Sequence, residues 1–301
     1  MELSEFRPFT IEDIPSMCAI YCRIPPLHSD YSSVSMLGWQ HYMDYLFKIE
    51  GDAAYFITRK NDKLYFRGPV GDYDDDTLRD FLLLAKDIGA DPPVGVLDPV
   101  MVGRIRKILP KIDPIPSREY FDYVYTSEAL RDLPGGDYLK IRNALNHFKK
   151  NQKYTIEPIG KDNDKEIREF FSRWCAQRDC DKEQYLESEK YFIAYCLDHY
   201  DLLRLEGIVL RVDGKIEASA IFEEFGPTTA VTHIEKGNPD IKGIYQAINQ
   251  ETAAYLAPRF EFINRESDMG IPGLRQAKER YRPHHMVEVF NLDRSQLTGI
   301  R

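Results

Sequence analysis

The run from Val231 to Pro283 constrains the fold of this chain more than any other stretch. Residues 228–234 are β-branched and apolar, which predicts a strand. Apolar residues at helical spacing then predict a helix over 243–256, and residues 260–263 predict a second strand. Because two strands joined through a helix usually pair in parallel, the run predicts a mixed sheet with helices packed against it.

Polar side chains follow both of these strands, at the point where each one ends. They are His233, Glu235 and Lys236 after the first strand and Asn264, Arg265, Glu266 and Asp268 after the second. The carboxyl ends of parallel strands meet at one edge of a sheet, where ligands of open α/β sheets bind. We therefore expect these residues to line one polar cleft. The alternative is that they cap helices and pair with one another on a solvated rim.

Two pairs of these residues have the chemistry of proton transfer. Acyl transfer to an amine needs a group that takes a proton and a group that stabilises the developing negative charge. His233 and Glu235 are candidate catalytic residues for the first role. Because they are two apart on a strand, we expect them to point the same way. Glu266 and Asp268 form a second candidate pair, two residues apart in a loop.

Basic residues in the closing part of the run are candidates for binding an anionic donor. They are Arg265, Arg275, Lys278 and Arg282. The last three recur at spacings of three and four residues, which predicts one helix face that holds a phosphate chain or an adenosine terminus. The alternative is that Arg265 and Arg275 pair with the acids Glu266, Asp268 and Glu251 and hold the loop shut.

Several spaced motifs in and before this run carry a resemblance to a known family. They are His233-x-Glu235-Lys236-Gly237-Asn238, Tyr245-x-x-Ile248-Asn249, Asn264-Arg265-Glu266-x-Asp268-x-Gly270-x-Pro272-Gly273-Leu274-Arg275-x-Ala277-Lys278 and Tyr281-x-Pro283, with Phe121-Asp122-Tyr123-Val124-Tyr125 and Arg142-x-x-x-Asn146-x-Phe148 upstream. Together they resemble the phosphatidylglycerol lysyltransferase C-terminal domain family over most of the chain. The block from Asn264 to Lys278 is the most specific part of the resemblance.

The resemblance implies an α+β fold with tandem GNAT-like domains, each a mixed central sheet flanked by helices, related to the Fem peptidoglycan aminoacyltransferases. Membrane-bound members of the family move an amino acid from aminoacyl-tRNA to a lipid head group. The motifs and the basic residues together suggest a set that binds substrate or donor. That set is Lys236, Asn238, Tyr245, Asn249, Asn264, Arg265, Arg275, Lys278 and Arg282.

The length of 301 residues suggests two domains. Leu133-Pro134-Gly135-Gly136 is the best linker, which predicts one domain over 1–133 and a second over 134–301 that carries the cleft. Within the first domain, apolar residues at helical spacing predict a helix over 39–47.

The net charge of −9 argues against a protein whose surface as a whole binds nucleic acid, but it is compatible with a local basic groove. The helix expected over 137–153 has that character. Its basic residues are Lys140, Arg142, His147, Lys149, Lys150 and Lys153. They predict a salt-sensitive phosphate-binding face for tRNA or a nucleotide. The alternative is an ordinary solvated face.

An acyl-CoA is the alternative donor. Residues 236–243 contain two glycines before a helix, and resemble only loosely the pyrophosphate loop of GNAT enzymes. Pro239 removes one N–H donor and Asp240 would repel phosphate. We therefore favour aminoacyl-tRNA over acyl-CoA, and we expect neither a tightly bound cofactor nor a metal site.

The five cysteines form no C-x-x-C pair, so we expect inert reduced thiols and a cytoplasmic location. We expect no signal peptide and no membrane helix, since no stretch approaches about 20 apolar residues. The function that follows is a soluble GNAT-type transferase. It moves an aminoacyl group from aminoacyl-tRNA, or an acyl group from acyl-CoA, to an amine or hydroxyl on a small molecule, peptide or lipid head group. The alternative is a non-catalytic ligand-binding module that retains the fold and the cleft.

Overall fold

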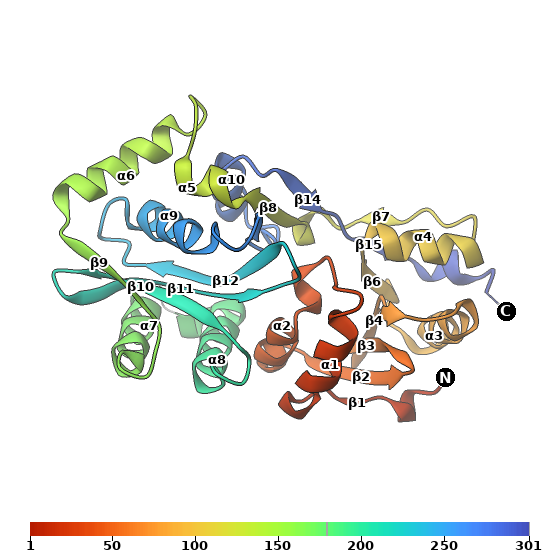
Figure 1. The fold of residues 1–301 in the computed structure, drawn as a ribbon. Coiled ribbons are helices and arrows are strands. Elements are labelled where there is room, and N and C mark those ends of the chain that lie inside the picture. The colour runs from red at the N-terminus through yellow and green to blue at the C-terminus, as the bar shows by residue number, and fades with distance from the viewer. Residues whose placement is uncertain (179, 301) are drawn as a thin grey trace. The chain divides into compact units, whose positions relative to one another are not determined.

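The computed structural model describes residues 1–178 and 180–300 (Figure 1). The contacts within the described chain divide it into two compact units. The first unit comprises residues 1–122, 267–270 and 287–301, and the second comprises residues 123–266 and 271–286. Among the described residues, every helix is too short or too polar to cross a lipid bilayer.

The first unit is built on a mixed eight-stranded sheet. Its strands are β1 (Arg7–Pro8), β2 (Asp44–Glu50), β3 (Asp52–Lys60), β4 (Lys63–Arg67), β5 (Val70–Asp72), β6 (Val94–Leu97), β7 (Ile115–Pro116) and β15 (Phe290–Leu292). They run in the order β1-β2-β3-β4-β6-β15-β7, and β5 also pairs with β3. The helices are α1 (Ile14–Tyr21), α2 (Ser33–Gly38), α3 (Asp75–Ile88) and α4 (Pro99–Ile108).

The helix predicted over 39–47 was wrong. Residues Trp39–His41 form one short 3-10 turn, and β2 begins at Asp44. Tyr45, Leu46 and Phe47 are consecutive and all buried, so both faces of β2 are covered at this point. A strand buried on both faces shows no alternation, so its apolar run cannot be told from a buried helix by spacing.

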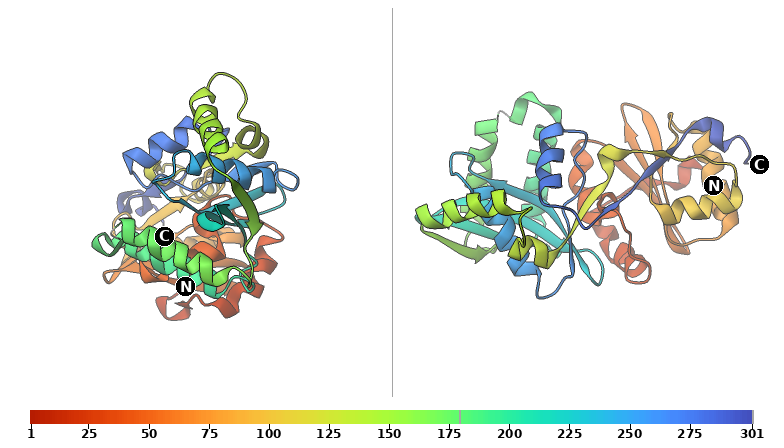
Figure 2. Two further views of the ribbon diagram at one scale, coloured as in Figure 1. Left: turned by 90° about the vertical axis from the view of Figure 1, so that its left-hand side faces the viewer. Right: turned by 90° about the horizontal axis from the view of Figure 1, so that it is seen from above.

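The second unit contains a seven-stranded mixed sheet with helices on both faces. Its strands are β8 (Asp122–Thr126), β9 (Tyr154–Pro158), β10 (Glu206–Val212), β11 (Lys215–Glu224), β12 (Thr229–Gly237), β13 (Phe262–Asn264) and β14 (His285–Val287), in the order β14-β8-β13-β12-β11-β10-β9. The helices are α5 (Ser127–Asp132), α6 (Leu139–Asn151), α7 (Asp164–Arg178), α8 (Gln184–Asp198), α9 (Ile244–Leu256) and α10 (Pro272–Arg280). Helices α6 and α9 cover one face, and α7 and α8 cover the other (Figures 1 and 2).

The strand–helix–strand run of the sequence is β12, α9 and β13, and β12 pairs with β13 in parallel as expected. The core on the α9 side contains Ala218, Ala220 and Phe222, which alternate along β11 and pack against α6 and α9. The mixed α+β architecture that the sequence predicted is confirmed in both units.

The division between the units differs from the predicted boundary at 133/134, which lies inside the second unit between α5 and α6. Strand β8 pairs with β13, which brings residues 123–133 into the second unit. Strand β15 pairs with β6, which places the end of the chain in the first unit. Such pairings join segments far apart in sequence and leave no local signal at a linker.

Candidate functional site

The polar residues of the predicted cleft lie where β12 and β13 separate. The two strands share three paired positions, of which Val231 and Asn264 are the last. Beyond that pair β12 continues to Gly237, whereas β13 ends and its chain turns through Arg265 and Glu266. The side chains of this turn therefore face the outer half of β12, which carries His233 and Glu235.

His233 and Glu235 do not point the same way, so that expectation was wrong. The register of β11 against β12 shifts by one residue, since Ile221 pairs with Ile234 whereas Phe222 pairs with Thr232. His233 is the extra residue of this β-bulge, and a bulge re-aims the side chains around it. The His233 ring lies 6.0 Å from the ring of Phe192 on α8. Glu235 instead bonds Asn249 on α9, which covers the opposite face of the sheet (Figure 1).

His233 forms one charged cluster with two glutamates. Its Nδ1 lies 2.8 Å from Oε1 of Glu266, and its Nε2 lies 2.9 Å from Oε1 of Glu223. Burial by itself lowers the pKa of His233, but the hydrogen bonds to the two carboxylates outweigh burial and raise that pKa to about 10. Both ring nitrogens then donate, so the ring is an imidazolium at neutral pH. In this arrangement His233 has no lone pair with which to act as a base.

Glu235 forms the second cluster, on the α9 face. Nη2 of Arg265 donates to one of its carboxylate oxygens at 2.8 Å, and Nδ2 of Asn249 donates to the other at 3.1 Å. The Arg265 guanidinium also lies 5.7 Å from the Tyr125 ring and 5.1 Å from the Tyr281 ring. These contacts hold Arg265 in a defined position against Glu235.

Two buried polar atoms beside Glu235 form no hydrogen bond with the described part of the chain. They are Nη1 of Arg265, a donor, and Oδ1 of Asn249, an acceptor. Buried polar groups nearly always have a partner, and a missing partner requires an explanation such as a bound molecule. The cluster around the Glu235 carboxylate therefore has one hydrogen-bond donor and one acceptor that a bound molecule could use.

The turn that carries Arg265 and Glu266 is fixed from behind by Lys278 of α10. Nζ of Lys278 donates to the carbonyl oxygen of Arg265 at 2.5 Å and to that of Glu266 at 2.9 Å. Oδ1 of Asn264 accepts the backbone N–H of Glu266 at 2.8 Å. Lys278 and Asn264 thus position the turn, and the Lys278 ammonium is already occupied by protein atoms.

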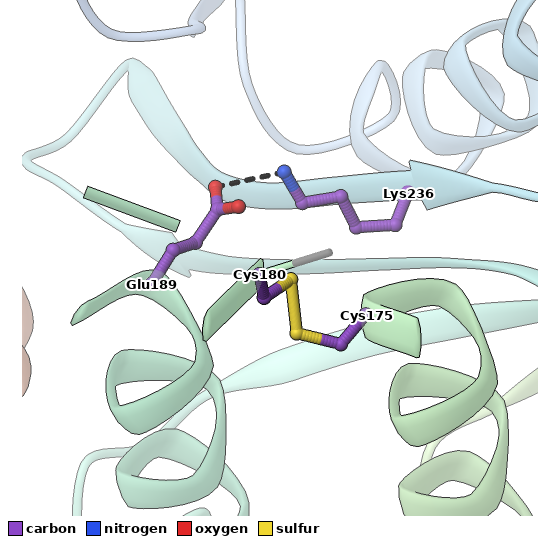
Figure 3. Close-up of a disulfide and its surroundings, with 4 residues drawn as sticks. All are labelled: Cys175, Cys180, Glu189 and Lys236. Carbon is purple, nitrogen blue, oxygen red and sulfur yellow. Dashed lines mark hydrogen bonds and ion pairs between the residues drawn. A yellow bond between two sulfur atoms is a disulfide. The ribbon is translucent and has the colours of Figure 1, made fainter. Parts of the chain in front are cut away.

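Lys236 lies on the α7 and α8 side of the sheet. Its ammonium is 2.7 Å from Glu189 of α8 and 4.4 Å from the centre of the Trp174 ring on α7. Trp174 Nε1 lies 3.5 Å from the hydroxyl of Tyr245. The Lys236–Glu189 pair lies beside a disulfide between the end of α7 and the following turn (Figure 3).

That disulfide joins Cys175 to Cys180. The expectation of five reduced thiols was therefore wrong for this pair, whose members lie five positions apart in the sequence. The pairing removes the cysteine argument for a reducing compartment, where disulfides are rare.

Residues 236–243 form a turn closed by its own hydrogen bonds. The side chain of Asn238 donates to Glu217 at 2.8 Å and accepts the backbone N–H of Asp240 at 3.0 Å. Gly243 has φ of +89°, and a Cβ there would lie 2.4 Å from the carbonyl oxygen of Ala144 on α6. The glycine is thus required where α9 approaches α6.

The remaining predicted residues lie outside these clusters. Asp268 belongs to the first unit, where it accepts from Arg118 at 3.2 Å and from the backbone of Gly270 at 2.9 Å. Arg275 is half-buried on α10. Arg282 is exposed and lies 3.4 Å from Asp137. Because α10 ends at Arg280 and Lys278 is buried, the expected single basic face of residues 275, 278 and 282 is not formed.

Sequence reasoning assigned no role to four residues that complete these clusters, namely Glu223, Glu189, Trp174 and Tyr125. Each comes from a different strand or helix, so no local spacing could have grouped them. Two signals were available, namely the acidic end of β11 at Glu223 and the place of Tyr125 in the motif of residues 121–125. Among the described residues, no group of three or more His, Cys, Asp or Glu side chains is placed to hold a metal ion.

Each unit has a mixed sheet flanked by helices, a tandem GNAT-like architecture, and in the second unit the parallel strands β12 and β13 separate at the polar clusters. The chain belongs to the family described as phosphatidylglycerol lysyltransferase, C-terminal, whose model matches residues 22–292. The resemblance drawn from the sequence motifs is therefore confirmed.

Three solved structures illustrate the likeness. A conserved protein of unknown function from Bacteroides thetaiotaomicron VPI-5482 is 28% identical, with a TM-score of 0.88 over 96% of this chain and 98% of that one. L-PGS from Bacillus licheniformis is 13% identical, with a TM-score of 0.65, and the match covers 98% of this chain and 94% of that one. FemX is 10% identical, with a TM-score of 0.57, and the match covers 99% of this chain and 100% of that one. FemX therefore shares the fold. No functionally curated protein matched the sequence.

Proposed function

We propose that this chain transfers an aminoacyl group from aminoacyl-tRNA to an amine or hydroxyl acceptor, at the Glu235–Arg265–Asn249 cluster. The observation that carries the proposal is the pair of unsatisfied buried atoms in that cluster, Nη1 of Arg265 and Oδ1 of Asn249. An aminoacyl ester offers the matching groups, since its carbonyl oxygen accepts and its α-ammonium donates. Membership of a family named for a lysyltransferase supports the same reaction class.

The chemistry follows from the charges of the cluster. The acceptor nitrogen or oxygen attacks the ester carbonyl carbon, and the bond from that carbon to the ribose oxygen of the tRNA breaks. Nη1 of Arg265 stabilises the negative charge that develops on the carbonyl oxygen, as a positioned donor does in other acyl transfers. Glu235 receives the proton of the attacking group and returns it to the departing ribose oxygen. His233 keeps Glu266 in place and takes no proton.

The turn at residues 236–243 supports aminoacyl-tRNA over acyl-CoA. A pyrophosphate needs several backbone N–H groups that point at it. Here the N–H groups of Asn238, Asp240 and Ile241 already bond to oxygens of Glu217 or of Asn238 itself. Pro239 has no N–H to offer.

The exposed face of α6 supports tRNA as the carrier. Lys140, Lys150 and Lys153 are exposed, and the described chain offers them no ion pair. Arg142 is instead engaged, because its guanidinium donates to the carbonyl oxygens of Leu133 and Gly135. These exposed lysines, two on α6 and one just after its end, provide cations for the phosphate backbone, and binding that depends on them weakens as salt rises.

The test uses the full chain and tRNA charged with radiolabelled amino acids, and follows label released to hydroxylamine or to phosphatidylglycerol vesicles. Arg265→Lys is expected to lower the transfer rate about 10²–10³-fold. The matched control Arg259→Lys, an arginine paired with Glu206 and near two rings of the same unit, should keep the wild-type rate. Binding of charged tRNA without release of label would contradict the reaction and favour a non-catalytic module. Turnover of an acyl-CoA instead would contradict the donor.

A further inference from the structure

The first unit contains a buried charged cluster that the proposed transfer does not use. Arg67, the last residue of β4, is only 6% exposed. Its Nη1 donates to Oδ2 of Asp30 at 3.2 Å, and its guanidinium lies 5.3 Å from the centre of the Tyr45 ring. A guanidinium has five N–H donors. The bond to Asp30 uses one of them, and no other described residue accepts from the rest.

The unused donors lie along one edge of the guanidinium. Nε of Arg67 is buried and has no hydrogen-bond partner in the described chain. Nη2, on the same edge, likewise donates to no described residue. The Nε–Nη2 edge is the one that binds two oxygens of a carboxylate or phosphate through parallel hydrogen bonds. Arg67 is therefore anchored through Nη1 and presents an intact bidentate edge.

The backbone around this edge is strained. Arg67 pairs with Gly95 in the parallel β4–β6 ladder, and that pair is the last before the strands separate. The next residue of β6, Val96, has φ of +56°, which is rare for a β-branched side chain. The hydroxyl of Tyr31 donates to the carbonyl oxygen of Val96 at 2.8 Å and holds this conformation. Strained backbone of this kind clusters at sites that bind ligands.

The cluster reaches the surface of the first unit through Asp30. The Asp30 side chain is 34% exposed, although the Arg67 side chain that it bonds is only 8% exposed. Tyr120 is 44% exposed, and burial of its hydroxyl, with the nearby charges of Glu119 and Asp30, raises its pKa.

We propose that the first unit holds a second ligand site, where the Nε–Nη2 edge of Arg67 binds the oxyanion of a small carboxylate or phosphate. Asp30 stays on Nη1 and keeps the guanidinium oriented, and its own charge limits the affinity for the anion. The site is independent of the transfer chemistry, because all of the residues that form it belong to the first unit.

The experiment titrates the full chain with inorganic phosphate and, separately, with acetate, at constant ionic strength. The readout is the NMR signal of the Arg67 Nε–H, identified by its absence in Arg67→Lys, together with the melting temperature. Each anion that binds should shift the signal and raise the melting temperature. A response to phosphate alone assigns a phosphoryl ligand, and a response to acetate alone assigns a carboxylate.

Two variants keep the test decisive. Arg67→Lys retains the charge but loses the planar edge, so the anion should bind at least about tenfold more weakly. The control Arg104→Lys, whose arginine lies over the Tyr73 ring of the same unit, should bind as the wild type does. Asp30→Asn removes the carboxylate that repels the anion and should therefore tighten anion binding. This variant tests the site even if Arg67→Lys fails to fold. An unshifted Nε–H signal with both anions, an unchanged affinity in Arg67→Lys, or no tightening in Asp30→Asn would each overturn the site.

Discussion

His233 and Glu235 lie on opposite faces of the seven-stranded sheet, although they are two residues apart in one strand. Their partners divide in the same way, since Glu266 bonds His233 whereas the adjacent Arg265 bonds Glu235. The bulge at His233 therefore separates a closed charge cluster on one face from a cluster with unsatisfied atoms on the other. The first stabilises the turn after β13, and the second is the side on which we place the chemistry.

Replacing His233 should destabilise the second unit strongly. His233→Gln leaves the partly buried carboxylates of Glu223 and Glu266 without their shared, fully buried cation, and losing it should cost up to about 3–5 kcal/mol, the range for a broken buried pair. Urea unfolding measures the loss. The control His147→Gln, on the exposed side of α6, should change the free energy of unfolding little. Equal stability of the two variants would mean that the cluster contributes nothing.

The contribution of His233 should also depend on pH in a defined window. Its pKa is raised from 6.5 to about 10 in the folded chain, so the folded state retains the proton longer than the unfolded state. The stabilisation is thus complete below about pH 6.5 and is lost as pH rises toward about 10. The unfolding free energies of the wild type and His233→Gln should converge over that range. If the difference in unfolding free energy between the two proteins grows with pH, His233 is not the cation assigned to it here.

Lys278 should matter for both stability and transfer. Lys278→Met keeps the length of the side chain but removes two hydrogen bonds to the turn, each worth about 1.5–3 kcal/mol for a charged donor. We expect unfolding at lower urea concentration and a lower transfer rate, because Arg265 is no longer held. Lys165→Met, at an exposed position of α7, is the control. Wild-type transfer by Lys278→Met would remove the positioning role.

The approach of α9 to α6 at Gly243 can be tested against a second glycine. Gly243→Ala forces a Cβ to 2.4 Å from the carbonyl oxygen of Ala144, at a φ of +89°. Gly214→Ala has a similar φ of +83°, but nothing lies within 4 Å of its Cβ. Gly214→Ala should therefore cost about 1 kcal/mol from backbone strain alone, and Gly243→Ala about 1–3 kcal/mol more from the clash. Equal melting temperatures would exclude the clash.

The disulfide predicts a redox dependence of stability. Cys175→Ser opens the covalent loop to Cys180 and should lower the free energy of unfolding by about 2 kcal/mol under oxidising conditions. Reductant should lower the melting temperature of the wild type and leave that of Cys175→Ser unchanged. Cys22→Ser, an exposed unpaired thiol, should behave as the wild type does. A wild type indifferent to reductant would show that the bond does not form in solution.

Local patterns in the sequence were enough to predict the strand, helix and strand of residues 228–263 and the parallel pairing of β12 with β13, whereas the family followed from the resemblance of its spaced motifs. They also predicted that polar residues follow both strands. These features depend on side-chain periodicity, turn residues and chain connectivity, which are properties of neighbouring residues.

Tertiary structure alone decided which polar residues meet. The bulge at His233 arises from the register of β12 against β11, and a one-residue shift moves a side chain to the other face. The partners Glu223, Glu189 and Trp174 come from separate strands and helices, as do Arg67 and Asp30 in the first unit. The sequence by itself therefore determined the elements and the edge at which polar residues follow the strands. The fold decided their directions and pairings, because these depend on contacts between segments far apart in the chain.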